Sequence, residues 1–245
     1  MKIYGLIGRS LGHSFSKKYF TEKFTSENYQ NCIYSNFELD CLGDNLEELK
    51  KNIELSGLNV TIPYKTEIIS FLDEVTEDTL RVNACNCIKI ENGKWIGYNT
   101  DVIGFEKSFI PGLKPGQVKA LILGTGGAAK AVAFVLKKLC IEFAYVSRSK
   151  TDLLPALLFE DISGEILNEF PIVINATPSG MYPNIDDYPN LPYELVSSQH
   201  YFYDLIYNPL KTKFLEKAEA KGATIQNGEE MLRIQAEESW KIWNS

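Results

Sequence analysis

The chain has 245 residues, of which 44% are hydrophobic and 12% aromatic, and its formal net charge is −7. This apolar content can form a buried core and argues against disorder, and the acidic balance argues against nucleic acid as a partner, because such proteins carry basic surfaces. No run approaches the ~20 consecutive apolar residues of a membrane span, and the first ten residues lack the apolar core of a signal peptide.

The five cysteines are odd in number and scattered along the chain. They are typical of reduced thiols, so we expect a cytoplasmic protein. Cys85 and Cys87 form a C-x-C pair, but no second pair of ligands follows, and the only histidines are His13 and His200. The sequence therefore predicts no metal site.

The first hundred residues alternate between short strands and helices. Strands are expected at residues 2–8, 32–37 and 57–63, with a hairpin of 87–91 and 94–98 around a type I′ turn at Asn92-Gly93. Helices are expected from about residue 17, over 44–53 and over 65–72. Ser14 or Ser16 is expected to cap the first of these helices.

The second part of the chain reads as a doubly wound α/β domain with a parallel sheet. A linking helix is expected at residues 101–109 and a linker at 111–116, before an almost unbroken apolar strand at 118–123. Further strands are expected at 143–147, 156–159, 172–176 and 201–204, and helices at 128–139, 165–170 and 212–221. An amphipathic helix over 229–243 places Leu232, Ala236, Trp240 and Trp243 on one face.

A glycine-rich loop lies between the strand at 118–123 and the helix that follows it. It comprises Gly124, Thr125, Gly126, Gly127 and Ala128. Glycine allows a sharp turn and lets backbone N–H groups approach a pyrophosphate at the positive end of a helix. A tight turn without a ligand is the alternative, because a glycine pattern alone is a weak signal.

The end of the next strand favours NADP over NAD. NAD enzymes usually carry an acidic residue there, about 20 residues after the loop, which binds the ribose 2′-hydroxyl. This chain instead has Ser147, Arg148 and Ser149. Arginine can pair with a 2′-phosphate through its planar fork, which a carboxylate would repel. A solvated basic turn is the plainer interpretation.

Several mixed polar motifs stand at the ends of expected strands. They are H-S-F-S at residues 13–16, N-V-T-I-P-Y-K at 59–65, N-T-D at 99–101, N-A-T-P-S-G-M at 175–181, Y-D-L-I-Y-N-P at 203–209 and M-L-x-x-Q-A at 231–236. In this order and over nearly the whole chain, the sequence resembles the shikimate dehydrogenase family. The resemblance implies two domains: a substrate-binding domain of residues 1–103 and 226–245, and an NADP-binding Rossmann domain of 104–225.

The resemblance also implies the reaction and the residues that carry it. The reaction is NADP-dependent oxidation of shikimate, or reduction of 3-dehydroshikimate in the biosynthetic direction that leads to chorismate and the aromatic amino acids. Lys65 and Asp101 would be the catalytic pair. Substrate would be bound by Ser14, Ser16, Thr61, Asn86, Tyr207 and Gln235. The cofactor would also contact Thr177, Ile206 and Gly228, besides the glycine loop and residues 147–149.

The expected chemistry gives Lys65 a role of its own. Hydride transfer to a ketone leaves an alkoxide that needs a proton and a nearby positive charge, and a lysine ammonium supplies both. Alternatively, Lys65 only stabilises the charge while a water relays the proton. Taken singly, Lys65 could be a solvated helix start, and Asp101, Ser14 and Ser16 could be helix caps.

Two alternative functions stay open. One is a quinate/shikimate dehydrogenase with broader cofactor use, and the other is a binding or regulatory relative without activity. The chain is short for the family, since residues 151–170 lack one helix of the nucleotide domain. The sequence predicts a monomer or a homodimer with small-molecule ligands and no nucleic-acid or membrane partner.

Overall fold

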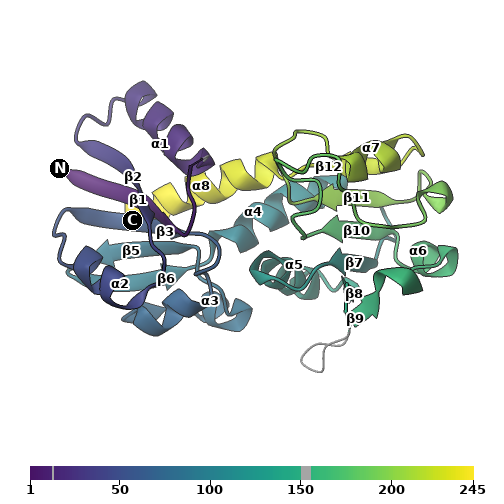
Figure 1. Cartoon of the computed structure of the whole chain (residues 1–245), viewed down its shortest axis with the longest axis horizontal. Coiled ribbons are helices and arrows are strands. Elements are labelled where there is room, and N and C mark those ends of the chain that lie inside the picture. Colours follow the sequence, from purple (N-terminus) through teal and green to yellow (C-terminus); the bar gives the residue numbers. More distant parts are fainter. Residues whose placement is uncertain (13, 150–155) are drawn as a thin grey trace. The chain divides into compact units, whose positions relative to one another are not determined.

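The computed structural model describes residues 1–12, 14–149 and 156–245 and divides into two compact units (Figure 1). Unit 1 comprises Met1–Thr100 with Ala236–Ser245, and unit 2 comprises Asp101–Gln235. Compared with the expected domains, residues 101–103 and 226–235 group with unit 2. His13 of the H-S-F-S motif, Lys150 and part of the shortened 151–170 segment lie outside the described residues.

Unit 1 is built on a mixed six-stranded sheet. In sheet order its strands are β2 (Cys32–Glu38), β1 (Lys2–Gly8), β3 (Leu55–Val60), β5 (Cys87–Glu91), β6 (Lys94–Tyr98) and β4 (Glu74–Val75). β1 runs parallel to β2 and β3, whereas β5 is antiparallel to both β3 and β6. The expected hairpin is confirmed, because Asn92 and Gly93 have φ values of 52° and 77°, both positive as a type I′ turn requires.

Helices cover both faces of this sheet. They are α1 (Phe15–Ser26), α2 (Gly43–Lys50), α3 (Glu77–Val82) and the end of α8 (Glu229–Trp243). One core cluster joins Phe20 and Phe24 of α1 to Trp240 and Trp243 of α8. A second cluster, on the α2 side, includes Leu42 and Leu46. β4 and α3 are both short, and the sequence pattern does not predict them.

The helix expected over residues 65–72 is instead a 3₁₀ helix over Glu67–Phe71. The carbonyl of Lys65 accepts a hydrogen bond from the N–H of Cys85 at 2.7 Å rather than from the next helical turn. The α2 helix also ends earlier than expected, at Lys50, because Asn52 forms a turn that leads into β3. Local periodicity does not reveal either of these competing backbone contacts.

Gly57 on β3 lies directly against the indole of Trp243. A Cβ added at Gly57 would stand 2.3 Å from Trp243 Cδ1, and the indole is fixed by a hydrogen bond from its Nε1 to the Ile88 carbonyl at 3.0 Å. We therefore expect Gly57→Ala to destabilise unit 1 by about 1–3 kcal/mol through overpacking. Gly12→Ala is the control, because a Cβ added there would meet no atom within 4 Å beyond its own chain neighbours.

Unfolding in urea can be followed by tryptophan fluorescence, since all three tryptophans belong to unit 1. An unfolding midpoint for Gly57→Ala equal to that of Gly12→Ala would contradict the predicted overpacking.

Unit 2 is an all-parallel, doubly wound sheet. Its strand order is β12 (Thr224–Gln226), β11 (Tyr201–Asp204), β10 (Ile172–Asn175), β7 (Lys119–Leu123), β8 (Glu142–Ser147) and β9 (Ala156–Leu158). Numbered within the unit, this is the order 3-2-1-4-5-6 of the Rossmann fold, whose ligands bind where the strand order reverses. That point lies between β7 and β10, so the predicted fold class is confirmed.

The helices of unit 2 are α4 (Thr100–Phe109), α5 (Gly127–Lys138), α6 (Gly164–Glu169), α7 (Lys213–Glu219) and the first part of α8. Ala120 to Leu123 of β7 are fully buried, as expected for a strand covered on both faces. Along α8, Ala236, Trp240 and Trp243 are buried and Leu232 is half-buried. Sequence analysis missed β12, which has only three residues.

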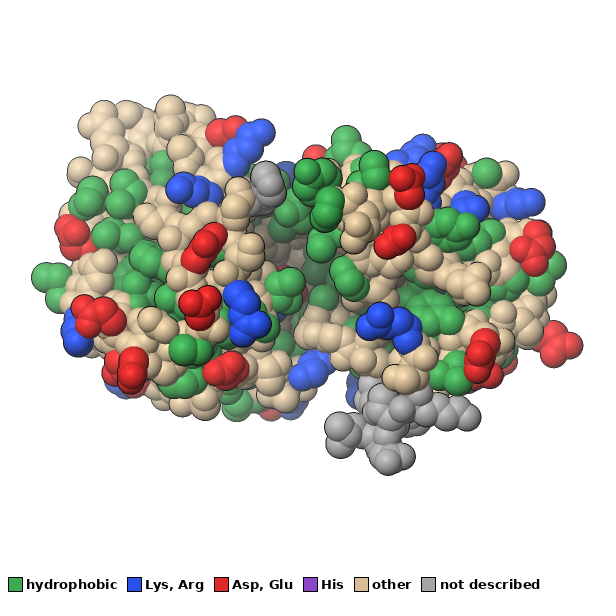
Figure 2. Space-filling view, viewed as in Figure 1, with side chains coloured by type: hydrophobic (Ala, Val, Ile, Leu, Met, Phe, Trp, Pro, Cys, Tyr) green, Lys and Arg blue, Asp and Glu red, His purple; other side chains and the backbone are tan. Residues whose placement is uncertain are grey.

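Charge is dispersed on the surface. In the view of Figure 2, basic and acidic side chains of the described residues are interspersed over both units, without a continuous basic area. Among these residues, the structure also holds no helix whose length and apolar character would suit a membrane span.

Candidate active site

Polar residues gather at one edge of the unit 1 sheet. β1 and β3 are parallel and both end at this edge, where the antiparallel β5 begins. Ser14 and Ser16 follow β1, Thr61 and Lys65 follow β3, and Asn86 directly precedes β5. The strand topology therefore brings to one edge the residues that the sequence motifs had suggested.

Backbone hydrogen bonds fix the loops that carry these residues. The N–H of Thr61 donates to a carbonyl of β1 at 2.9 Å, and the carbonyl of the half-buried Lys65 accepts from Cys85 at 2.7 Å. The side-chain amide of Asn99 donates to the carbonyl of Ala84 at 2.7 Å. The loops that follow β3 and β6 are thus joined through the segment that precedes β5.

A buried polar network orients Asn86. Its Oδ1 accepts from the N–H of Thr100 at 2.7 Å, and its Nδ2 donates to Thr100 Oγ1 at 3.0 Å. Asn59 Nδ2 donates to the Asn86 carbonyl at 3.2 Å and to Ser239 Oγ at 2.9 Å. Because buried polar groups are costly unless they are paired, this network holds Asn86 in one orientation.

The two serines of α1 have different surroundings. Ser14 is the N-cap of α1, and its Oγ accepts from the N–H of Lys17 at 3.1 Å. Ser16 is buried and hydrogen-bonded to Tyr34, whose hydroxyl donates to Asn59 Oδ1 at 2.9 Å. Burial raises the pKa of Tyr34 well above its usual value, so this hydroxyl stays protonated. The prediction that Ser14 caps the first helix is therefore confirmed.

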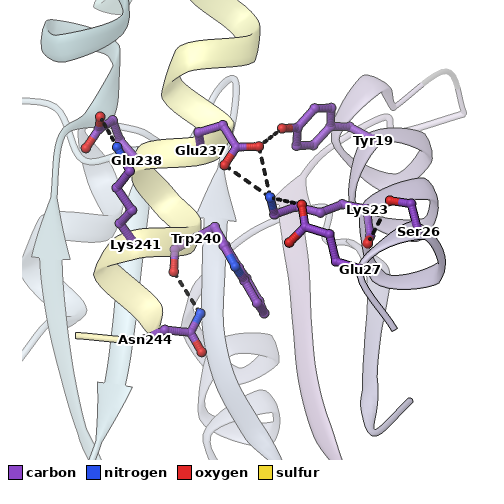
Figure 3. A network of polar contacts seen from close by, with 9 residues as sticks. All are labelled: Tyr19, Lys23, Ser26, Glu27, Glu237, Glu238, Trp240, Lys241 and Asn244. Atoms are coloured by element: carbon purple, nitrogen blue, oxygen red, sulfur yellow. Dashed lines mark hydrogen bonds and ion pairs between the residues drawn. The ribbon is translucent and has the colours of Figure 1, made fainter. Parts of the chain in front are cut away.

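Charged side chains join α1 to α8 within unit 1 (Figure 3). Lys23 Nζ binds Glu237 at 3.1 Å and Glu27 at 2.7 Å, and the Tyr19 hydroxyl also donates to Glu237. Burial lowers the pKa of Lys23, but the hydrogen bonds to the two glutamates raise it more, so the net shift is upward. These contacts hold the helix that carries Ser16 against α8.

Three of the predicted catalytic and substrate-binding residues belong to unit 2. Asp101 is buried in the first turn of α4, where a carboxylate is favoured by the helix dipole. Gln235 on α8 lies next to α4, since its Cβ would be 3.2 Å from a Cβ added at Gly104. Tyr207 follows β11, and burial raises its pKa. Because Lys65 belongs to unit 1 and Asp101 to unit 2, their pairing stays a prediction.

Unit 2 contains a cavity of about 1000 Å³ at the carboxyl ends of its strands. Seven of the predicted cofactor residues line it: Gly124, Thr125, Gly126, Ser147, Arg148, Ser149 and Thr177. The other four, Gly127, Ala128, Ile206 and Gly228, are not among its lining residues. Ile206 and Gly228 lie together after β11 and β12, where the Gly228 N–H donates to the Ile206 carbonyl at 3.0 Å.

The glycine loop fits a pyrophosphate. Gly124 has a φ of +99°, a conformation that favours glycine. Gly126 is the N-cap of α5 and provides no side chain to pair with the first N–H groups of the helix. A Cβ at Gly126 or Gly127 would meet no atom within 4 Å. The start of α5 therefore leaves backbone donors open to an anion.

Arg148 is exposed at the rim of the same cavity, directly after β8. Within the described part of the chain, no carboxylate forms an ion pair with it. Ser147 Oγ donates to the Ser149 carbonyl at 2.6 Å, which closes the turn beneath it. A free guanidinium fits a 2′-phosphate, and the absence of an acidic residue from 147 to 149 agrees with this charge.

Sequence analysis missed other residues of the cavity. They include Leu158 at the end of β9, Phe159 and Glu160 after it, and Met181, Tyr182, Asn184, Asp187 and Tyr188 in the segment after β10. Met181, Tyr182 and Tyr188 are exposed. The signal that the sequence offered was the presence of these apolar side chains in a loop rich in proline, asparagine and aspartate. Within the described ranges, no three His, Cys, Asp or Glu side chains gather as a metal site.

Comparison with known proteins agrees with this geometry. The profile of the shikimate dehydrogenase substrate binding domain matches residues 6–88. The shikimate dehydrogenase (NADP(+)) of Caldicellulosiruptor bescii is 40% identical over 99% of this chain and 89% of its own length. The structure of the Aquifex aeolicus shikimate dehydrogenase has a TM-score of 0.87 and 34% identity, covering 100% of this chain and 92% of that one.

A further structure is that of the Thermus thermophilus shikimate 5-dehydrogenase in complex with NADP(H) and shikimate. It has a TM-score of 0.84 and 30% identity, covering 99% of this chain and 93% of its own. Nearly full-length identity of this degree, together with the Rossmann strand order and the occupied motif positions, shows that the chain belongs to the shikimate dehydrogenase family.

Proposed function

We propose that the protein catalyses the NADP-dependent, reversible oxidation of shikimate to 3-dehydroshikimate. The biosynthetic direction is reduction, on the route to chorismate and the aromatic amino acids. The observation that carries the proposal is the gathering of Ser16, Thr61, Lys65 and Asn86 at one sheet edge of unit 1. The nucleotide cavity of unit 2 and the relatives named above support it.

NADP, when bound, supplies a hydride acceptor. The N–H groups at the start of α5 are proposed to hold its pyrophosphate, and Arg148 its 2′-phosphate. Gly124, Thr125, Gly126, Ser147, Ser149 and Thr177 line the cavity beside them. Gly127, Ala128, Ile206 and Gly228 complete the proposed cofactor site.

Lys65 and Asp101 are proposed to act on the hydroxyl of the substrate. Lys65 takes the hydroxyl proton as the hydride leaves, and in reduction its ammonium returns the proton and stabilises the alkoxide. Asp101 would orient the lysine and bind the same hydroxyl. Alternatively, Lys65 only stabilises the charge, and a water relays the proton. Substitution of Lys65 by arginine distinguishes this role from direct proton transfer.

The remaining polar residues are proposed to bind the substrate. The hydroxyls of Ser14 and Ser16 would hold its carboxylate. Short hydroxyl side chains at the start of a helix suit an anion, because they donate hydrogen bonds and the helix dipole is positive there. Thr61, Asn86, Tyr207 and Gln235 would bind the ring hydroxyls. The fixed amide of Asn86 is able to donate to one hydroxyl and accept from another.

The test of this function uses purified protein, shikimate and NADP, with the absorbance of the reduced nicotinamide as the readout. We expect turnover with this pair and a much lower kcat/KM when quinate replaces shikimate or NAD replaces NADP. Comparable rates with quinate and NAD would indicate the broader dehydrogenase. Absence of turnover with every pair would indicate a binding or regulatory protein.

Arg148 provides a specific prediction about the cofactor. Replacing it by glutamine should raise the Kd of NADP by about 10- to 100-fold, because charge-assisted hydrogen bonds are each worth about 1.5–3 kcal/mol. The Kd of NAD, which has no 2′-phosphate, should change little. Calorimetry measures both constants, and Arg81→Gln in unit 1 is the matched control. An equal loss for both nucleotides would contradict the assignment.

We propose a cytoplasmic enzyme, from the scattered free cysteines of the sequence, and a monomer or homodimer. Light scattering of the purified protein would determine the assembly.

A further inference from the structure

Asp204 is a buried carboxylic acid at the end of β11 for which the proposed reaction has no use. Its side chain is fully buried and receives three hydrogen bonds. Asn175 Nδ2 and the N–H of Ile206 both donate to Oδ1 at 3.0 Å. The hydroxyl of Thr212 donates to Oδ2 at 2.6 Å. Three donors directed at one buried acid indicate that its side chain is held in a single orientation.

These contacts fix the side-chain amide of Asn175, which ends the neighbouring strand β10. A carboxylate oxygen can only accept, so the NH₂ group of Asn175 must face Asp204 and its carbonyl oxygen must face away. The same NH₂ group also donates to the Ser179 carbonyl, at 3.3 Å. Oδ1 of Asn175 then accepts from Thr177 twice, from the backbone N–H at 3.1 Å and from the hydroxyl at 2.6 Å.

The arrangement leaves Thr177 with no hydrogen to offer a ligand. A threonine hydroxyl has one hydrogen and two lone pairs. The hydrogen is directed to Asn175, and one lone pair accepts from the N–H of Ser179 at 3.2 Å. The second lone pair is what the side chain still has available, and Thr177 lines the nucleotide cavity.

We propose that Asp204 is a positioning residue of the nucleotide site: by fixing the amide of Asn175, it makes Thr177 an obligatory hydrogen-bond acceptor toward the ligand. The inference rests on the proposed function, since the ligand is taken to be NADP. Thr177 therefore contacts an N–H or O–H group of the nucleotide, such as a ribose hydroxyl, the adenine amino group or the carboxamide. Phosphate oxygens, which only accept, are excluded as its partner.

Protonation of Asp204 does not alter this polarity. Oδ1 already accepts from two donors, so an added proton would lie on Oδ2 and point to Thr212. The variant Asp204→Asn can adopt the same arrangement, with its oxygen toward Asn175 and its NH₂ toward Thr212. Asp204→Ala removes the nearer of the two acceptors of the Asn175 NH₂ group and leaves the Ser179 carbonyl at 3.3 Å, so the amide is held less firmly. The two variants thus separate the acceptor function of residue 204 from its charge.

The first experiment measures the Kd of NADP by calorimetry, with circular dichroism to verify folding. Thr177→Val should raise the Kd by about 3- to 10-fold, as expected for a lost neutral hydrogen bond, and Thr177→Ser should restore it. The Kd of Asp204→Asn should stay within about twofold of the wild-type value. Asp204→Ala should bind NADP more weakly, with a loss of affinity no larger than that of Thr177→Val. The double variant Asp204→Ala/Thr177→Val should be little weaker than Thr177→Val alone.

Additive losses in the double variant would indicate a merely structural role for Asp204 and overturn the proposal. Binding by Thr177→Val that equals the wild type would overturn it as well, and so would failure of Thr177→Ser to restore affinity. These two outcomes stay informative if Asp204→Ala does not fold. Absence of NADP binding by the wild type would overturn the proposed function and with it this inference, and is distinguishable from the other outcomes.

The second experiment identifies the ligand group. Two NADP analogues each lack one donor: hypoxanthine replaces adenine in one, and an acetyl group replaces the carboxamide in the other. The analogue that lacks the partner of Thr177 should bind the wild type more weakly than NADP does. In Thr177→Val, this analogue and NADP should bind with the same Kd. If Thr177→Val weakens the binding of both analogues as much as it weakens the binding of NADP, the partner of Thr177 is a ribose hydroxyl. Inorganic pyrophosphate, a competitor without N–H donors, should bind both proteins equally; weaker binding to Thr177→Val would overturn the acceptor assignment.

Discussion

Replacing Lys65 by alanine should lower kcat for shikimate oxidation by at least about 100-fold, because general acid–base catalysis contributes about 10²–10⁴ to such reactions. Lys65 is the proposed proton acceptor, and its loss also removes the positive charge beside the developing alkoxide. Substrate binding should be largely retained, since the hydroxyl and amide groups at the same sheet edge are intact. The loss should therefore appear in kcat more than in KM.

Two further lysine variants make this experiment specific. Lys65→Arg keeps a positive charge that cannot be given up, so substantial activity in this variant would favour charge stabilisation with a water relay. Loss as severe as in Lys65→Ala would favour direct proton transfer. Lys51→Ala is the control, because this exposed lysine lies at the end of α2 and pairs with the neighbouring Glu48. Near-normal kcat in Lys65→Ala would remove this residue from the mechanism.

Much of the fold is predictable because strong local patterns coincide with the elements. The apolar strand before Gly124 and the glycine loop after it mark the first strand–helix unit of the Rossmann domain. Where the prediction was wrong, the cause was a non-local or short-range backbone contact. The carbonyl of Lys65 accepts a hydrogen bond from the N–H of Cys85, so it does not take part in the helix expected to begin at this residue. Asn83 similarly closes α3 with a φ of 53°, a left-handed cap that asparagine tolerates.

The candidate site is predictable only in part. Polar residues at strand ends, such as Thr61 and Asn86, are visible in the sequence because they interrupt apolar patterns. Their supporting contacts are not visible, since Asn59 and Ser239 are paired over a sequence separation of 180 residues. Asn175 and Asp204 were within the recognised motifs, but their roles depend on neighbouring parallel strands that place the two side chains in contact.

Burial also makes Asp204 a source of pH-dependent stability. Desolvation raises the pKa of Asp204 to about 7, although hydrogen bonds from Thr212, the Ile206 N–H and Asn175 act in the opposite direction. In the unfolded chain the carboxyl has its ordinary pKa of about 3.9. Between these two values the folded protein holds a proton that the unfolded chain does not. The stabilisation is therefore complete below about pH 4 and is lost as the pH rises through about 7.

Asp204→Asn should abolish this dependence, since an amide does not titrate. Between about pH 4.5 and 8, the free energy of unfolding of the wild type should fall relative to that of the variant by about 3 kcal/mol. Asp186→Asn, which alters an exposed carboxyl of unit 2, is the control. Because the three tryptophans report on unit 1, the measurement requires circular dichroism in urea together with amide exchange in β10 and β11. Parallel pH profiles for the wild type and Asp204→Asn would show that the carboxyl titrates in the folded protein as it does in the unfolded chain.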